Sequence, residues 1–326
     1  MSQELSNPKA LSTDKLGDFQ LTQPPPGFVD DPYPWYALLR RHDPVHRLTA
    51  NSFFLSSYDD VVAAYRDPST SSDKNAEFTP KFGDSPLLEH HTTSLVFNDP
   101  PLHTRVRRLI MGALNQRAIR QMEVGLVQLI DDLLDHMLDR DQIDIISDFA
   151  ARIPIEVIGN LLNVPHSERG PLRGWSLAIL SALEPVPGQA VLELGNQAVI
   201  EFTEYLKILV KTRRQSPGDP SSDVLSRLIQ GEEDGEKLTE PELLHNCIFL
   251  LNAGHETTTN LIGNGLHALI RHRDQLERLA AEPGLIDTAV EELLRFESPL
   301  QLNNRLATEP MVISGTQIPA GSFLTL

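Results

Sequence analysis

The sequence predicts a mainly α-helical protein of one domain, residues 1–326, with a small β sheet. Apolar residues recur on nearly every side of a long helical pattern over residues 240–270, which is typical of a helix at the centre of a core. Amphipathic helical patterns fill most of the remaining chain, and strand-like stretches occur near its beginning and its end. No linker, repeat or low-complexity tract divides the chain, so we expect one large domain.

The composition is that of a soluble globular protein and excludes several classes of function. Of the 326 residues, 40% are hydrophobic and 22% are charged, and the net charge of −17 argues against a nucleic-acid partner. No apolar run approaches the ~20 residues that a membrane span needs, and the N-terminus lacks the apolar segment of a secretory signal. The single cysteine, Cys247, cannot form an internal disulfide, which fits a cytoplasmic location.

The N-terminal part begins with a polar lead-in, residues 1–28, which we predict to be flexible or extended. Helical patterns follow over residues 31–41 and 58–65, with two short strands between them at 45–48 and 52–56, favouring a hairpin. Residues 69–98 show no clear periodicity and are predicted to form a long loop. Loops of that length inside a domain are usually functional or disordered.

Helices dominate the middle of the chain. Helical patterns cover residues 100–114, 117–138, 153–162, 166–183, 189–214 and 224–230, and Ile143-Asp144-Ile145-Ile146 is strand-like. After the central helix, residues 275–281 and 286–297 are predicted to be helical. The stretches 301–306, 311–314 and 322–326 are strand-like, with turn signals at Gly315 and at Pro319-Ala320-Gly321.

The central helix carries a start signal and, in its middle, residues that a helix disfavours. Thr239 and Glu242 match a capping box. Gly254 costs ~1 kcal/mol relative to alanine, and three threonines follow the charged Glu256 in an apolar segment. Two interpretations remain open. A hydroxyl and a carboxylate could deliver protons to a small ligand close to the backbone, or threonine hydroxyls could bond to carbonyls and relieve a helix kink.

Three motifs resemble those of one enzyme family. Ala253-Gly254-His255-Glu256-Thr257-Thr258 resembles the oxygen-activation motif of cytochromes P450, (A/G)-G-x-(D/E)-T-(T/S). Glu292-Leu293-Leu294-Arg295 is similar to the family's E-x-x-R pair, and Asp99-Pro100-Pro101-Leu102-His103-Thr104-Arg105 to its D-P-P-x-H-T-R segment. The resemblance runs from about residue 31 to residue 326 and is closest to soluble bacterial members. It implies the cytochrome P450 fold, a b-type haem, and insertion of one atom of O2 into a small apolar organic substrate.

The resemblance also implies roles for particular residues. Glu256 and Thr257 would deliver protons, with Ala253 and Gly254 beside the haem. Carboxylates of the haem would be held by His103, Arg107 and Arg305. A buried pair, Glu292 and Arg295, would fix the structure. Electrons would come from NAD(P)H through a separate ferredoxin or flavodoxin-type donor and its reductase. The family's layout suggests a substrate pocket lined by Leu95, Val96, Leu250, Leu300 and Leu302.

Taken without the resemblance, the same residues have simpler interpretations. His103 and Arg107 lie at i and i+4 and could form a solvated basic face. Glu292 and Arg295 could be an exposed ion pair worth ~0.3 kcal/mol. His90 and His91 fall in the predicted loop, where solvent-exposed imidazoles are expected rather than metal ligands.

The sequence departs from the family at the haem ligand. The family holds its iron through a cysteine thiolate in a C-terminal glycine-rich loop, and residues 1–326 contain no such loop. We therefore expect a truncated chain whose thiolate ligand lies beyond residue 326. Cys247, in an apolar part of the central helix, is expected to be a core residue with a raised pKa. The alternative is an inactive helical ligand-binding or interaction protein that keeps the fold without the thiolate.

Overall fold

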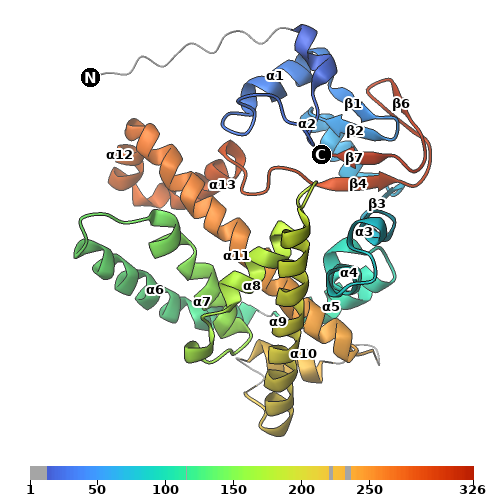
Figure 1. The fold of residues 1–326 in the computed structure, drawn as a ribbon. Coiled ribbons are helices and arrows are strands. Elements are labelled where there is room, and N and C mark those ends of the chain that lie inside the picture. Colours follow the sequence, from blue (N-terminus) through green and yellow to red (C-terminus); the bar gives the residue numbers. More distant parts are fainter. Residues whose placement is uncertain (1–12, 115, 220–222, 232–235) are drawn as a thin grey trace. The chain divides into compact units, whose positions relative to one another are not determined.

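A computed structural model describes residues 13–114, 116–219, 223–231 and 236–326 (Figure 1). The chain divides into two compact units, one of Met1–Asp73 with Leu302–Leu326 and one of Lys74–Gln301. The mainly helical class predicted from the sequence is confirmed, and every strand in the described residues belongs to the first unit. No described helix combines the length and the apolar character that crossing a membrane requires. The prediction of a single domain stays a prediction.

The first unit is built around a five-stranded sheet of order β1-β2-β7-β4-β3 (Figure 1). β1 (Val45–Thr49) and β2 (Ser52–Leu55) form the predicted antiparallel hairpin, and β3 (Thr70–Ser71) lies at the opposite edge. β4 (Asn304–Ala307) and β7 (Phe323–Thr325) come from the other end of the chain. β7 pairs in parallel with β2 and antiparallel with β4, so the last strand in the sequence occupies the centre of the sheet.

A second hairpin belongs to the same unit. β5 (Met311–Ile313) and β6 (Thr316–Ile318) are joined by Ser314 and Gly315, whose φ angles are 44° and 80°. Positive φ at both central residues is the geometry of the tight turns that suit the twist of a hairpin. β6 is absent from the sequence prediction, although Gly315 was recognised as a turn signal.

Two helices, α1 (Tyr33–His42) and α2 (Tyr58–Arg66), confirm the predicted helices of this unit. The flexible lead-in was predicted too long. Residues 1–12 lie outside the described residues, but a 3-10 turn (Thr13–Asp18) follows, and Leu16 and Phe19 are buried against Trp35 and Leu39. Burial of these two apolar side chains places residues 16–19 on the core of this unit.

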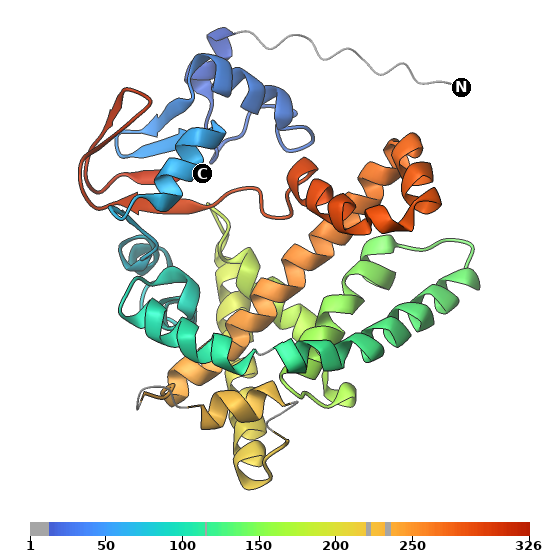
Figure 2. The ribbon, with the colours of Figure 1, turned by 180° about the vertical axis from the view of Figure 1, so that it is seen from behind.

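The second unit is helical throughout its described residues. α11 (Glu240–Arg271) runs through it, and α7 (Arg152–Leu161), α8 (Leu172–Ser181) and α9 (Gln189–Gln215) contact it (Figures 1 and 2). The remaining helices are α3 (Asn75–Phe82), α4 (Pro86–Thr93), α5 (Leu102–Ala113), α6 (Gln116–Leu138), α10 (Val224–Gln230), α12 (Arg273–Ala281) and α13 (Ile286–Phe296). One large core cluster draws buried apolar residues from α3 to α11.

The predicted capping box of α11 is confirmed. The Thr239 hydroxyl accepts a hydrogen bond from the Glu242 N–H (3.3 Å), and the Glu242 carboxylate accepts one from the Thr239 N–H (2.8 Å). The predicted burial on nearly every side holds only for the first half of the helix. After Thr259, Gly265 is the one buried residue of α11, and Ile270 is 57% exposed.

The long loop predicted for residues 69–98 is wrong. Two helices, α3 and α4, occupy most of it, followed by a 3-10 turn, η2 (Leu95–Phe97). Ser85 caps α4 by accepting a hydrogen bond from the Leu88 N–H (3.3 Å), and Pro86 fills its first turn. Each helix has 8 residues, which is shorter than the window over which helical periodicity can be recognised. His90 and His91, expected in solvent, are buried on α4.

The strand predicted at residues 143–146 is also wrong. A π-helical turn, η3 (Ile145–Ala150), takes its place. The Asp144 carboxylate accepts hydrogen bonds from the N–H groups of Ile146 (2.9 Å) and Ser147 (3.2 Å), which starts a helical turn at the residue that looked like a strand position. Four residues rich in isoleucine are too few to separate a strand from a capped turn.

Candidate functional site

The motif at residues 253–258 lies in the middle of α11. One side of the helix is buried here, and the other side is exposed. His255 is 1% exposed and faces the core, and Ala253 is exposed. Gly254, Glu256 and Thr257 are half-buried between these two sides. Glu256 and Thr257, which the sequence assigns to proton delivery, are therefore neighbours on a face that is neither sealed in the core nor fully in water.

The Thr257 hydroxyl donates a hydrogen bond to the Ala253 carbonyl (2.8 Å), and the Thr259 hydroxyl donates one to the His255 carbonyl (2.8 Å). Both are bonds back to the preceding turn, as the structural interpretation of the threonines expects. A hydroxyl that donates in this way keeps its lone pairs, so it can still accept a hydrogen bond, and it must leave the Ala253 carbonyl to give its own proton to another group. The proposed proton delivery by Thr257 stays a prediction.

The environment of Glu256 favours its protonated form. Burial is the larger cause that raises the pKa of this carboxyl, and the negative charge of Glu184, in the turn between α8 and α9, raises it further. A raised pKa brings a carboxyl closer to the range in which it can hold and release a proton near neutral pH. This is the electrostatic behaviour that a proton donor at the motif requires.

His255 connects the motif to α8. Its Nδ1 lies 3.3 Å from the Ser176 hydroxyl on α8, and its buried Nε2 has no hydrogen-bond partner. Burial, and next the positive charge of Arg173, lowers the pKa of His255 to about 4, so the ring is neutral at pH 7. The sequence prediction attached no function to His255, and only its position inside the motif could have drawn attention to it.

Gly254 has a packing role that the sequence prediction missed. A Cβ placed on Gly254 would lie 2.8 Å from Cδ1 of Ile158 on α7. Two later glycines of α11 are also in close contact with a neighbouring element. A Cβ on Gly263 would lie 2.5 Å from Ile146, and a Cβ on Gly265 would lie 3.0 Å from Leu293. The missing side chains let neighbouring elements approach α11 closely. The contact of Ala253 and Gly254 with a cofactor stays a prediction.

We expect Gly254→Ala to gain less stability than a glycine-to-alanine change elsewhere in a helix, because the added methyl group must displace Cδ1 of Ile158 and this offsets the helix-propensity gain of about 1 kcal/mol. Gly125→Ala is the matched control. Gly125 lies inside α6, nothing is within 4 Å of its added Cβ, and the change should stabilise by about 0.5–1 kcal/mol through helix propensity. Urea denaturation of both variants measures the difference, and equal stabilisation by both would contradict the packing role.

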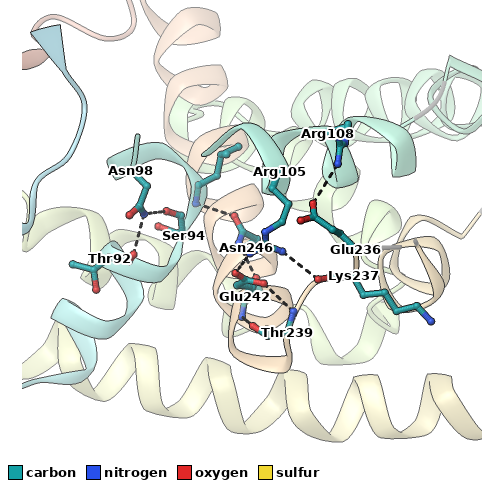
Figure 3. A network of polar contacts seen from close by, with 11 residues as sticks. Thr92, Ser94, Asn98, Arg105, Arg108, Glu236, Lys237, Thr239, Glu242 and Asn246 are labelled. Carbon is teal, nitrogen blue, oxygen red and sulfur yellow. Dashed lines mark hydrogen bonds and ion pairs between the residues drawn. The ribbon is translucent and has the colours of Figure 1, made fainter. Parts of the chain in front are cut away.

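α5 docks on the start of α11 through two ion pairs (Figure 3). The Arg105 guanidinium hydrogen-bonds the Glu242 carboxylate and also donates to the Lys237 carbonyl (3.2 Å). Arg108 pairs with Glu236 at 3.3 Å. Arg105 and Glu242 are largely buried, with side-chain exposures of 23% and 10%, whereas Arg108 and Glu236 are 38% and 48% exposed. The first pair is therefore the structural one.

His103 and Arg107, the predicted anion-binding residues of α5, remain available. His103 is half-buried and Arg107 is exposed, and neither side chain has a hydrogen bond or ion pair with the residues that the structure describes. In the first unit, the Arg305 guanidinium lies 5.2 Å from the Tyr65 ring centroid, and its buried Nε has no hydrogen-bond partner. Unused donors on a cation fit the carboxylates of a haem, which Arg and His can bind through charge-assisted hydrogen bonds.

Cys247 does not fit the role of an iron ligand. The residue is fully buried in the core cluster, and burial raises the pKa of its thiol to about 12. Only the thiolate binds metal, so a thiol that stays protonated at neutral pH is a poor ligand. The sequence prediction that Cys247 is a core residue with a raised pKa is confirmed.

Glu292 and Arg295 form the predicted pair within α13. The guanidinium donates to both carboxylate oxygens, at 2.7 and 2.6 Å, but the side chains are 57% and 69% exposed. The burial that the resemblance implies is therefore not found, and the pair corresponds to the simpler interpretation of an ion pair in solvent. Glu292 also borders a cavity of about 370 Å³ between the end of α11, α12 and α13, lined by apolar residues such as Leu269, Leu293 and Phe296.

The predicted pocket residues have different environments. Leu95 is buried, Leu250 is half-buried against the same core cluster, and Val96 is 42% exposed. Leu300 is 59% exposed, and Leu302 packs on the aromatic core of the first unit. Leu95 and Leu250 are the two that share a core.

Comparisons with known proteins agree with this geometry. The model of the family described as cytochrome P450 matches residues 177–326. The chain is 37% identical over 302 residues to the cytochrome P450 monooxygenase PikC of Streptomyces venezuelae, covering 90% of this chain and 70% of that protein. It is 36% identical to the vitamin D(3) 25-hydroxylase of Pseudonocardia autotrophica, covering 92% of this chain and 73% of the relative.

Solved structures give the same result for the fold. The structure of CalO2 matches with a TM-score of 0.86 and 28% identity, covering 94% of this chain and 76% of that one. The structure of P450BioI in complex with hexadec-9Z-enoic acid ligated acyl carrier protein matches with a TM-score of 0.84 and 31% identity, covering 92% and 77%. The predicted fold is thereby confirmed.

Proposed function

Because this chain belongs to the cytochrome P450 family, we propose that it acts as a haem-dependent monooxygenase that inserts one atom of O2 into an apolar organic substrate. The observation that carries the proposal is the Glu256-Thr257 pair in the middle of α11. A carboxyl whose pKa is raised by burial and by Glu184 stands beside a hydroxyl on a half-buried face. Such a pair can hold a proton and pass it on.

Bound haem supplies the chemistry of oxygen activation, and the residues of this chain bind, orient and protonate around it. His103 and Arg107 on α5, and Arg305 on β4, would hold the haem carboxylates with donors that no other described residue uses. Glu256 would hold the proton on its carboxylate oxygen, and Thr257 Oγ1 would pass it on. Leu95 and Leu250 would offer apolar surface to the substrate and exclude water.

The substrate class and partners are proposed by analogy with the relatives. Their names describe a vitamin D(3) hydroxylase and a complex with a fatty acid carried by acyl carrier protein, both of which involve largely apolar molecules. We propose a small apolar organic substrate, with electrons from NAD(P)H through a ferredoxin or flavodoxin-type donor and its reductase. The reduced state of the one cysteine fits a cytoplasmic location.

The haem spectrum of the reduced protein with carbon monoxide tests the proposal. A chain that continues through the family's cysteine loop should show the red-shifted Soret band of thiolate-ligated haem. Residues 1–326 alone should not, because the Cys247 thiol is protonated and buried. If the continued chain binds no haem, the alternative of a non-catalytic ligand-binding protein is favoured. A red-shifted band in residues 1–326 that Cys247→Ser abolishes would overturn the placement of Cys247 in the core.

A further inference from the structure

Three buried imidazoles meet where α4 packs on α11. His90 and His91 on α4 and His245 on α11 are 2%, 2% and 3% exposed. The ring centroid of His90 lies 4.9 Å from that of His91 and 5.5 Å from that of His245. The rings are therefore in contact across the boundary between the two helices, and the proposed function uses none of them.

One ring nitrogen of each histidine in this imidazole cluster lacks a hydrogen-bond partner. His90 Nδ1, His91 Nε2 and His245 Nδ1 are buried without a hydrogen-bond partner. The His91 ring is surrounded by aromatic residues, with ring centroids at 5.4 Å from Phe78 and Phe82 and 5.5 Å from Phe97. An apolar site of this kind tolerates a neutral imidazole far better than an imidazolium.

The charged groups that face the cluster do not reverse this preference. The Glu89 carboxylate of α4 lies 3.7 Å from His245 Nε2, but its side chain is 64% exposed. Lys81 of α3 faces His91, and Lys207 of α9 faces His245, and each adds positive charge. Burial is the main cause that lowers the pKa of all three imidazoles, to about 3 for His91.

Asn246, the residue after His245 on α11, binds η2, which follows α4 in the chain. Asn246 accepts a hydrogen bond from the Leu95 N–H (2.9 Å) and donates one to the Glu242 carbonyl (2.7 Å). Asn98 closes the segment by donating to the carbonyls of Thr92 (2.9 Å) and Ser94 (2.7 Å), as Figure 3 shows. Two consecutive residues of α11 thus fix α4 at one end and η2 at the other.

We propose that His90, His91 and His245 are positioning residues, which hold α4 and η2 on α11 while they are neutral and release them when they are protonated. The segment carries Leu95, so its release changes the substrate pocket; this consequence rests on the proposed function. The release itself depends only on the described contacts between α3, α4, η2, α9 and α11.

The sign of the effect follows from linkage. The pKa of each imidazole is lower in the closed state than its ordinary value of 6.5, so the stabilisation is complete above pH 6.5 and is lost as pH falls below it. An opened segment exposes imidazoles that take up protons. Between pH 7.5 and 5.5 the release of His91 alone raises the opening constant about tenfold, and the release of His90 and His245 acts in the same direction.

Hydrogen–deuterium exchange of residues 1–326 at pH 7.5 and 5.5 tests this directly. After correction for the intrinsic exchange rate, protection of the α4 and η2 amides should fall by at least about tenfold, while α7 in the same unit keeps its protection. His91→Phe should pack among its aromatic neighbours and make the loss of protection about tenfold smaller. His136→Gln, at an exposed position of α6, should leave the full change in place.

Three outcomes would overturn the proposal. One is a loss of α4 protection smaller than about threefold, a second is an equal loss in α7, and a third is an unchanged pH dependence in His91→Phe. If His91→Phe does not fold, the comparison of α4 with α7 in the unaltered chain still decides. Exchange is measured without haem. A chain that shows no thiolate-haem spectrum can therefore still show the pH-dependent loss of protection, and a chain with that spectrum can lack this loss.

Discussion

Replacing Glu242 with alanine should lower the free energy of unfolding by about 3–5 kcal/mol at neutral pH. The carboxylate is the partner of the largely buried Arg105 guanidinium, and it also caps α11 through the Thr239 N–H. Its removal leaves a largely buried cation with the Lys237 carbonyl but no carboxylate partner, and one N–H at the helix start without an acceptor. The same change loosens α5, which carries His103 and Arg107.

Glu236→Ala is the matched control, because it breaks the neighbouring ion pair of α5, whose members Arg108 and Glu236 are both more than a third exposed. That variant should lose less than about 1 kcal/mol. Urea denaturation at pH 7 separates the two variants, and equal losses would show that burial of the Arg105 pair has no energetic consequence.

Acid should remove the contribution of Glu242. Burial alone would raise the pKa of this carboxyl, but hydrogen bonds from Arg105 and Thr239 outweigh it and lower the pKa below 4.5. A lowered pKa means that the stabilisation is complete above pH 4.5 and is lost as pH falls through the folded-state value. The difference between the parent and Glu242→Ala should therefore shrink in acid.

Thr257→Ala should lower the rate of product formation by about 10²–10⁴-fold in the haem-loaded enzyme, because the hydroxyl beside Glu256 no longer passes on a proton. Haem content and substrate binding should stay near those of the parent. NAD(P)H consumption should continue, with its reducing equivalents diverted to hydrogen peroxide or water. The measurement is product formed per NAD(P)H consumed, together with peroxide released.

The control for this variant is Thr259→Ala. Thr259 makes the same bond to the preceding turn, at the same 2.8 Å, but its side chain is buried against the core. A loss shared by both variants would mean that the threonines act through helix geometry. Parental coupling in Thr257→Ala would remove the residue from the proton path.

Long or well-capped elements were predictable from the sequence. α11 combines a capping box with over thirty residues of helical pattern, and the β1–β2 hairpin has two strand-like stretches with a short turn between them. The errors concern short segments, where two structures compete with similar local preferences. α3 and α4 are each only 8 residues long, and Asp144 caps a π-helical turn where an isoleucine-rich stretch suggested a strand.

The sequence singles out candidate site residues by their type, but it does not show which residues surround them. The sequence places Glu256 and Thr257 together, but only the structure shows that Glu184 adds to the raised pKa. It assigns Gly254 to a cofactor, which stays a prediction, and only the structure shows that Ile158 from α7 packs against this glycine. Contacts such as these join residues far apart in the chain, and a pattern within one segment carries no information about them.

The position of β7 affects the order in which the protein can fold during synthesis. β1 and β2 leave the ribosome early, but the strand that joins them to β4 is not made until residues 323–325. At about 5–20 residues per second, the hairpin waits on the order of tens of seconds for its partner. During that time the edge of β2 that will receive β7 has free N–H and C=O groups, which makes the nascent chain sensitive to pairing with other strands.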